Sequence, residues 1–305
     1  MRRAYTDSAS DDFTTSTYSP ANLIIACAEI KPRQTVAALC CMLAAKDRAC
    51  LAGGVEQWFW VPHPRPLAEF RLYCFAHAGA GASAFALWAG AEPSEIEVVG
   101  IQLPGRETRF SEPLVDSFSP SAVAIAELIA TQPKVPFALF GHSAGAHLAV
   151  RVACQVIERH LPLIHLFLSG ASCNPPAESI YKLNGAAFLR RVSDRYGELP
   201  VELTADAQIW SIFERVLKAD LKALETDVPH ARPLALPMTV ISGSRDKIVD
   251  PDNLHQWQSW SREKVRFEVL DADHFSYRRE PAPYLSVITR QLNGRVSLGR
   301  HALPG

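Results

Sequence analysis

The stretch FALFGHSAGAHLAV, residues 137–150, places one serine between two glycines where the sequence pattern changes. The apolar run Phe137 to Phe140 has the character of a buried strand, and the small residues from Ala144 onward suit a helix. Ser143 therefore occupies a strand-to-helix turn of the form G-x-S-x-G. This arrangement is typical of a nucleophile elbow, in which a strained turn exposes the serine hydroxyl. The alternative is a tight corner in which the serine has no chemical role.

Two backbone N–H groups are candidates for an oxyanion hole. The N–H of Ala144 would lie at a helix N-terminus, where unpaired amides favour a developing negative charge. A second donor is expected from the glycine- and alanine-rich loop FAHAGAGASAF, residues 75–85, and Ala78 is the predicted residue. The other interpretation of this loop is a phosphate cradle, but it has neither the lysine of a P-loop nor the spacing of a dinucleotide site.

Six short apolar runs alternate with helix-like segments from Trp58 onward. The predicted strands are residues 71–76, 96–103, 137–140, 163–169, 236–242 and 265–270. Near-continuous apolar runs suit strands that are buried on both faces of a parallel sheet. The alternation predicts an α/β fold with a doubly wound, mostly parallel sheet. The segment 173–235 interrupts this rhythm with helical sequence, so we expect an inserted helical lid there.

A serine nucleophile needs a base that takes its proton and a carboxylate that orients the base. In an α/β-hydrolase the acid and then the histidine follow the serine, each in a loop after a strand. The strand at 236–242 is followed by Asp246, Asp250 and Asp252. Asp250 precedes Pro251 and is expected to cap a helix, and Asp252 would lie in the first turn of that helix. Asp246 is therefore the predicted acid, with a solvated loop carboxylate as the alternative.

The predicted base is His274, because the strand at 265–270 runs directly into DADHFSY. Other histidines lack this position after a strand. His255 falls in a helical segment, His142 lies inside the elbow, and His147 belongs to a polar stripe of the helix. A structural loop histidine is the alternative for His274.

Composition excludes several classes of function. The chain has 305 residues, of which 48% are hydrophobic and 21% charged, as in soluble globular proteins. Its net charge of −1 gives no attraction to nucleic acid or to an anionic membrane, and no run reaches the ~18 apolar residues of a membrane span. The seven cysteines form no CxxC pair. We therefore expect reduced thiols, a cytoplasmic protein and no metal site.

The predicted domain organisation has three parts. Residues 1–55 are expected to be a poorly ordered extension, because the first twenty are rich in Ser, Thr and Asp. An alternative is that translation starts near Val55, which the intact mass of the native protein would decide. Residues 56–295 are the predicted catalytic domain, with the lid at about 173–235, and residues 296–305 are a C-terminal tail.

With these residues assembled, the chain resembles the type II thioesterases that accompany non-ribosomal peptide and polyketide synthases. The resemblance runs from about Trp58 to Leu292 and rests on several stretches in the same order. These are LYCFAHAGAGASAF, EIEVVGIQLPGRETRFSEP, GHSAGAH, VLKADLKALET, GSRDKIVDP and DADHF. The family often has methionine after the nucleophile, where this chain has Ala144, and its usual Pro and Gly are Ala76 and Ala80 here.

The resemblance implies an α/β-hydrolase that cleaves acyl groups from the phosphopantetheine arm of carrier proteins and so clears stalled or misprimed synthases. It assigns Ser143, Asp246 and His274 as nucleophile, acid and base, with no metal or cofactor. The alternatives are a fatty acyl-carrier-protein hydrolase, another esterase or acyltransferase on this fold, or a non-catalytic partner of carrier proteins. The acyl group, the synthase and the oligomeric state are not predicted.

Two further features have two interpretations each. Arg106, in LPGRE, either contacts substrate or carrier protein or, as we favour, pins its loop through ion pairs with neighbours such as Glu107. Trp210, Phe213 and Leu217, in the predicted lid, either line an acyl chamber or form a packing stripe.

Overall fold

The computed structural model describes residues 55–174, 176, 178–197, 199–226 and 233–299. The predicted N-terminal extension lies outside these residues apart from Val55, and so does the end of the predicted C-terminal tail. The last helix, α10 (Pro281–Gly299), continues past the predicted domain end at residue 295. No helix in the described part of the chain has the length and apolar character to cross a membrane.

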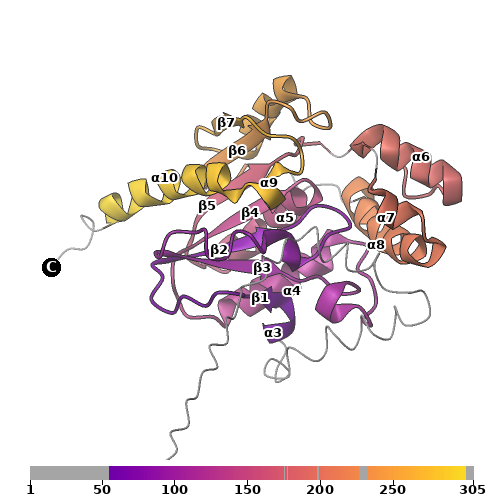
Figure 1. The fold of residues 1–305 in the computed structure, drawn as a ribbon. Coiled ribbons are helices and arrows are strands. Elements are labelled where there is room, and N and C mark those ends of the chain that lie inside the picture. The colour runs from indigo at the N-terminus through magenta and orange to yellow at the C-terminus, as the bar shows by residue number, and fades with distance from the viewer. Residues whose placement is uncertain (1–54, 175, 177, 198, 227–232, 300–305) are drawn as a thin grey trace, which may run out of the picture.

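A seven-stranded sheet with the order β1-β3-β2-β4-β5-β6-β7 forms the centre of the molecule (Figure 1). The strands are β1 (Phe59–Trp60), β2 (Phe70–Phe75), β3 (Ile96–Ile101), β4 (Phe137–His142), β5 (Leu163–Ser169), β6 (Met238–Gly243) and β7 (Arg266–Leu270). All neighbours from β3 to β7 pair in parallel, and β1 pairs antiparallel with β3. Every residue of β3, β4 and β6 is buried, as their apolar sequences predict. The predicted mostly parallel α/β fold is confirmed.

Helices cover both faces of this sheet. On one face, α4 (Phe118–Ala130) and α5 (Ala144–Glu158) share a hydrophobic core with the strands, to which η3 (Pro251–Trp260) adds Trp257. On the other face, η1 (Ala82–Phe85), α9 (Ser276–Arg279) and α10 form a second core. The sheet is therefore doubly wound. Two short elements lie at the edge of the sheet's first strands: α3 (Val55–Trp58) directly precedes β1, and η2 (Glu107–Arg109) follows β3.

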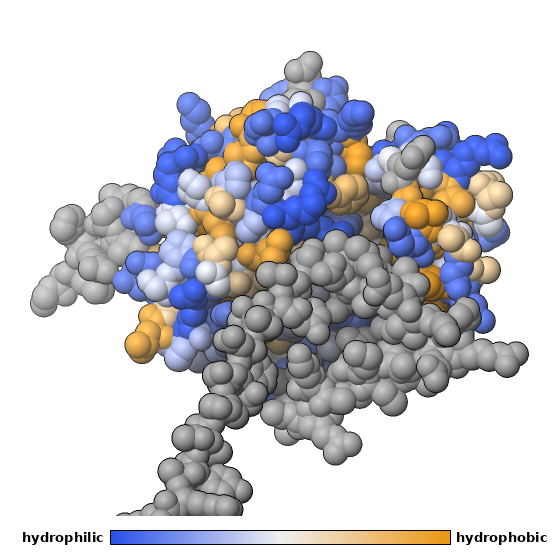
Figure 2. Space-filling model, in the orientation of Figure 1, coloured by the Kyte–Doolittle hydropathy of each residue, from blue (hydrophilic) through white to orange (hydrophobic). Residues whose placement is uncertain are grey.

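Between β5 and β6, the described residues form three helices: α6 (Gly185–Tyr196), α7 (Val201–Thr204) and α8 (Ala207–Thr226). We call this segment the β5–β6 insertion. Its helices lie together beyond one end of the strands (Figure 1). In Figure 2 they stand as a lobe at the right whose visible surface mixes hydrophilic and hydrophobic residues. The segment that broke the strand–helix rhythm in the sequence is thus helical.

The order of the strands creates a crevice between β2 and β4. The chain passes from β2 to β3 on one side and then to β4 on the other side of β2. Loops that leave the carboxyl ends of such neighbours diverge, and ligands bind in the gap between them. The loop after β2 and the turn that contains Ser143 therefore meet at this point of the sheet.

Candidate active site

Ser143 lies directly between β4 and α5 in an uncommon backbone conformation. Its φ of 55° and ψ of −122° fall where residues other than glycine are rarely found. Hydrogen bonds fix the turn on both sides: the Ser143 N–H donates to the Ser169 carbonyl at 2.8 Å, and the Ala146 N–H donates to the Ser143 carbonyl at 2.9 Å. The side chain is half-buried. This is the strained strand-to-helix turn that a nucleophile elbow requires.

The two glycines of the motif are there because the backbone elements approach closely. A Cβ on Gly141 would lie 2.3 Å from the Gly145 carbonyl oxygen, and a Cβ on Gly145 would lie 2.3 Å from the Phe75 carbonyl oxygen. Both distances are far inside van der Waals contact. Gly141 and Gly145 thus let α5 pack against the ends of β4 and β2.

Asp246 and His274 form a buried hydrogen-bonded pair. The Nδ1 atom of His274 lies 2.8 Å from Oδ2 of Asp246, and the exposed fractions of the two side chains are 4% and 1%. The second carboxylate oxygen accepts the N–H groups of Ile248 at 2.8 Å and Val249 at 3.2 Å. Since Nδ1–H donates to the carboxylate, Nε2 carries the lone pair and is free to act as a base.

The imidazole of His274 lies beside the turn that holds Ser143. Its ring centroid is 4.8 Å from that of His142, the residue that precedes the serine. The His142 ring itself is a core group: it stacks on Tyr277 with centroids 4.1 Å apart, and its Nδ1 lies 3.0 Å from Oγ of Ser169. The structure therefore brings Asp246 and His274 together and sets them next to the elbow.

The rings of His142 and His77 extend from His274 as a chain of aromatic contacts, with centroids 4.8 Å apart for His142 and His274 and 6.4 Å apart for His77 and His142. The sequence analysis did not predict this cluster of imidazoles. The Nδ1 atom of His77 lies 2.6 Å from the Tyr277 hydroxyl oxygen. Burial lowers the pKa of both His77 and His142 well below the usual value, and the nearby His274 lowers it further. Both rings are therefore neutral near pH 7, so neither places a positive charge beside His274 when that residue takes up a proton.

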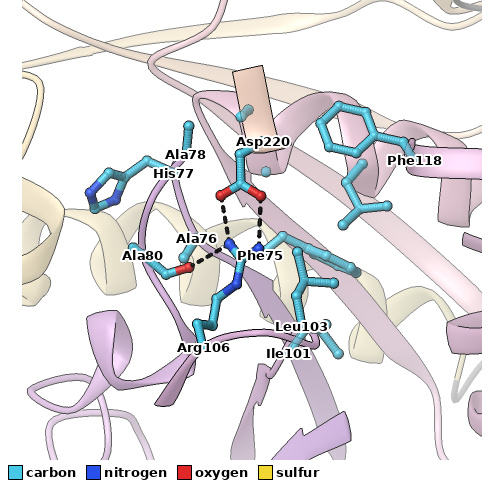
Figure 3. Close-up of a pocket in the computed structure, with 13 residues that line it drawn as sticks. Phe75, Ala76, His77, Ala78, Ala80, Ile101, Leu103, Arg106, Phe118 and Asp220 are labelled. Atoms are coloured by element: carbon cyan, nitrogen blue, oxygen red, sulfur yellow. Dashed lines mark hydrogen bonds and ion pairs between the residues drawn. The ribbon is translucent and has the colours of Figure 1, made fainter. Parts of the chain in front are cut away.

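The two predicted oxyanion donors line one cavity. We call residues 76–81, which follow β2, the oxyanion loop. No acceptor in the described part of the chain takes the N–H of Ala78, and the N–H of Ala144, the first residue of α5, is one that a helix leaves unpaired. The cavity holds about 360 Å³ of empty space, part of it open to solvent. Apolar side chains form much of its wall, among them Phe75, Ile101, Leu103, Phe118 and Leu148 (Figure 3).

A buried ion pair forms the polar side of this cavity. Arg106 makes two parallel contacts with Asp220 of α8, Nη1 to Oδ2 at 2.5 Å and Nη2 to Oδ1 at 2.8 Å (Figure 3). The favoured interpretation of Arg106, a loop pinned by an ion pair, agrees with this contact, but the partner is not Glu107. The Glu107 carboxylate instead accepts the N–H and hydroxyl of Ser83.

Asp220 is a site residue that the sequence analysis missed, although the sequence holds a signal for it. Helical spacing places Asp220 in the buried stripe of α8 together with Leu217, Leu221 and Leu224. A carboxylate in such a stripe needs a buried cationic partner. Nothing local in the sequence, however, identifies that partner as Arg106, which is 114 positions away.

The apolar residues of α8 lie over the oxyanion loop. A Cβ on Gly79 would lie 3.2 Å from the Phe213 ring and 3.5 Å from a methyl group of Leu217. Neither residue lines the cavity described above, and Trp210 does not line it either. The sequence allowed two interpretations of this stripe, as the wall of an acyl chamber or as a packing stripe. In this structure Phe213 and Leu217 pack against the oxyanion loop.

Comparison with known proteins places this geometry in a family. The model of a family described as "Thioesterase domain" matches residues 70–292. The chain is 30% identical over 243 residues to the gramicidin S biosynthesis protein GrsT of Aneurinibacillus migulanus, covering 78% of this chain and 94% of that protein. It is 33% identical over 224 residues to the medium-chain S-acyl fatty acid synthase thioesterase of Rattus norvegicus, covering 70% and 83%.

A solved structure has the same fold. RedJ, a thioesterase from the prodiginine biosynthetic pathway in Streptomyces coelicolor, is 32% identical, with a TM-score of 0.66, and the match covers 78% of this chain and 94% of that chain. The family match contains all the predicted site residues and the six parallel strands. The family expected from the sequence motifs is confirmed. The chain belongs to the thioesterase domain family and is a thioester hydrolase.

Proposed function

We propose that the chain is a type II thioesterase that releases acyl groups from the phosphopantetheine arm of carrier proteins in non-ribosomal peptide or polyketide synthesis. The observation that carries the proposal is the buried Asp246–His274 hydrogen bond beside the strained turn at Ser143. GrsT and RedJ, both named for the biosynthesis of a natural product, support the link to a synthase. The biological task is to clear stalled or misprimed acyl groups.

In the first half of the proposed reaction, Ser143 becomes acylated. Nε2 of His274 takes the hydroxyl proton as Oγ attacks the thioester carbonyl carbon, and Asp246 stabilises the resulting imidazolium through Nδ1–H. The N–H groups of Ala78 and Ala144 donate to the oxyanion. The carbon–sulfur bond then breaks, and the proton on His274 passes to the departing thiolate, so that the free phosphopantetheine thiol leaves.

In the second half, water releases the acyl group. His274 takes a proton from the water molecule as its oxygen attacks the acyl-serine carbonyl, and the same N–H groups bind the second oxyanion. The carbon–oxygen bond to Ser143 breaks, and His274 returns the proton to the serine. The net change is the hydrolysis of one thioester to one carboxylic acid and one thiol.

The β5–β6 insertion acts in this proposal as a lid over the acyl site. Its helix α8 supports this role, because Phe213 and Asp220 contact the oxyanion loop. The proposed compartment is the cytoplasm, where the carrier proteins of such synthases work. The three cysteines in the described part of the chain, Cys74, Cys154 and Cys173, are free thiols, which suits a reducing environment.

The test is mass spectrometry of a carrier protein loaded with an acyl-phosphopantetheine group. Incubation with the wild-type enzyme should remove the acyl mass and leave the free thiol, and the Ser143→Ala variant should leave the acyl-carrier intact. The oxygen ester of the same acid serves as the comparison substrate and should turn over more slowly. Release by Ser143→Ala at the wild-type rate, or cleavage of oxygen esters alone, would refute the proposal.

A fatty acyl-carrier-protein hydrolase is the second candidate, and the 33% identity to the medium-chain fatty acid synthase thioesterase supports it. A series of acyl-carriers from acetyl to dodecanoyl separates the two functions. An editing enzyme should accept short acyl groups, whereas a rate maximum confined to medium chains would favour the second candidate.

A further inference from the structure

The oxyanion loop has little means of holding its own shape. Residues 76–81 read AHAGAG, so His77 is the only residue with a polar side chain, and that side chain turns toward Tyr277. Gly79 has a φ of +84°, a conformation open chiefly to glycine. Within the loop, the Ala80 N–H donates to the His77 carbonyl at 3.1 Å. Groups from other elements must therefore hold the backbone on either side of Ala78.

Asp220 supplies one of these groups from α8. Its Oδ2 atom accepts the N–H of Gly79 at 2.7 Å, immediately after the proposed oxyanion donor Ala78. In the described part of the chain, no other side chain of the β5–β6 insertion hydrogen-bonds this loop. Arg106, the partner of Asp220, donates from Nη1 to the Ala80 carbonyl at 3.3 Å (Figure 3). The ion pair thus holds two consecutive residues of the loop: Asp220 binds the N–H of Gly79, and Arg106 binds the carbonyl of Ala80.

The charge of the pair also matters, because both residues line the cavity with Ala78 and Ala144. A lone carboxylate there would oppose the negative charge that develops on the substrate oxygen. The bidentate contact with Arg106 neutralises Asp220 while leaving it able to accept the Gly79 N–H. The arrangement provides a hydrogen-bond acceptor for the loop without a net negative charge at the site.

We propose that Asp220 is a positioning residue for the oxyanion hole. It fixes Gly79 directly and Ala80 through Arg106, so that the Ala78 N–H stays aimed at the reacting oxygen. The geometry of the hole consequently depends on the docking of α8, which makes the β5–β6 insertion part of the catalytic apparatus. This inference rests on the proposed function, because it takes Ala78 as the donor.

Three variants separate positioning from stability. Asp220→Asn keeps the size of the side chain but removes its charge. The double variant R106M/D220L replaces a buried ion pair by apolar groups of similar volume, a change that buried pairs often tolerate without loss of stability. The matched control is Lys222→Gln, on the same helix as Asp220. It removes the exposed ion pair between Lys222 and Asp116 and leaves the contacts with the oxyanion loop in place.

The readouts are kcat, KM, the unfolding temperature and the affinity for two inhibitors. A trifluoromethyl ketone bonds to Ser143 and places an oxyanion in the hole, whereas a thioether analogue of the substrate only occupies the site. We expect Asp220→Asn and R106M/D220L to lower kcat roughly 10- to 100-fold with KM within about threefold of the wild type. In these two variants the affinity for the ketone should fall by the same factor as kcat, and the affinity for the thioether should stay at the wild-type value. The Lys222→Gln control should match the wild type in every readout.

A wild-type kcat in both Asp220 variants would overturn the proposal. It would also be overturned by a rise in KM alone, or by losses of ketone and thioether affinity in equal measure, since either result would indicate a role in binding or folding only. Failure of the proposed function looks different: the wild-type enzyme would leave every carrier thioester intact. The ketone measurement would still report on the loop in that case, because it requires only Ser143 and the oxyanion donors.

Discussion

Ser143 affects both the stability of the fold and the proposed chemistry, because it is the proposed nucleophile and its backbone is strained. Its positive φ costs about 1–3 kcal/mol for a residue with a side chain, and the surrounding hydrogen bonds hold it there. The strain depends on the Cβ atom and not on the hydroxyl. Chemistry and stability can therefore be separated at this position by two substitutions.

Ser143→Ala and Ser143→Gly should both abolish hydrolysis, because each removes the proposed nucleophile. Their stabilities should differ, since alanine keeps the strained Cβ and glycine relieves it. We expect the glycine variant to unfold at a temperature no lower than that of the alanine variant, as measured by calorimetry. A glycine variant that is clearly less stable than the alanine variant would contradict the account of strain.

Asp246→Asn should lower kcat on the order of 10³- to 10⁴-fold, because an amide no longer holds His274 in the tautomer that leaves Nε2 unprotonated. Asp250→Asn is the control, since Asp250 is the neighbouring carboxylate that the sequence analysis set aside as a cap. Its kcat should stay at the wild-type value in steady-state assays of thioester turnover. The reverse ranking would assign the acid to Asp250.

At the scale of elements, the approach of α5 to β2 depends on Gly145. Gly145→Ala should cost at least about 2–3 kcal/mol of unfolding free energy and most of the activity, because the new methyl group overlaps the Phe75 carbonyl oxygen. Gly185→Ala, at the exposed first residue of α6, meets no atom within 4 Å and only strains a φ of +52°. It should cost about 1–2 kcal/mol and leave kcat unchanged. Urea unfolding and steady-state assays check both, and equal losses in the two variants would contradict the prediction.

The buried strands were predictable because each is a short apolar run between polar segments. The run at 163–169 is β5 without change, and the run at 71–76 is β2 shifted by one residue. The strand β1 escaped prediction because two residues, Phe59 and Trp60, carry no period, and their pairing with β3 is set by tertiary contacts.

The residues of the candidate site also fall into two groups: those that a local sequence pattern predicts and those that only tertiary contacts bring together. Ser143, Asp246 and His274 each follow a predicted strand, so the order of elements along the chain located them. The Arg106–Asp220 pair joins a loop to a distant helix, and periodicity does not encode such a contact. The sequence indicated that Arg106 pins its loop but could not name the partner.

For the molecule as a whole, the buried His142 and the half-buried His77 and His147 set the response to acid. Burial lowers the pKa of His77 and His142 well below the usual value and that of His147 to about 4. Between pH 6.5 and 4 the unfolded chain therefore binds more protons at these residues than the folded chain does. Stability should be level above about pH 7 and fall as the pH drops through this range, although Glu107, whose pKa burial raises, acts in the opposite direction.

Urea unfolding from pH 8 to 4.5 measures this dependence. The midpoint concentration should fall steadily below pH 6.5, and His147→Gln should make that fall less steep. Carboxylates with lowered pKa values, such as Glu112 and Asp273, lose their contribution at more acidic pH and so do not obscure the window. A midpoint that is constant down to pH 4.5 would contradict the assignment.

The position of the insertion divides the site along the chain. The proposed nucleophile and the two proposed oxyanion donors come before residue 170, and the proposed acid and base come after residue 238. During synthesis, Ser143 thus leaves the ribosome before His274, the base proposed to activate it. We therefore expect a chain that ends before β6 and β7 to have no thioesterase activity, because it lacks the proposed acid and base.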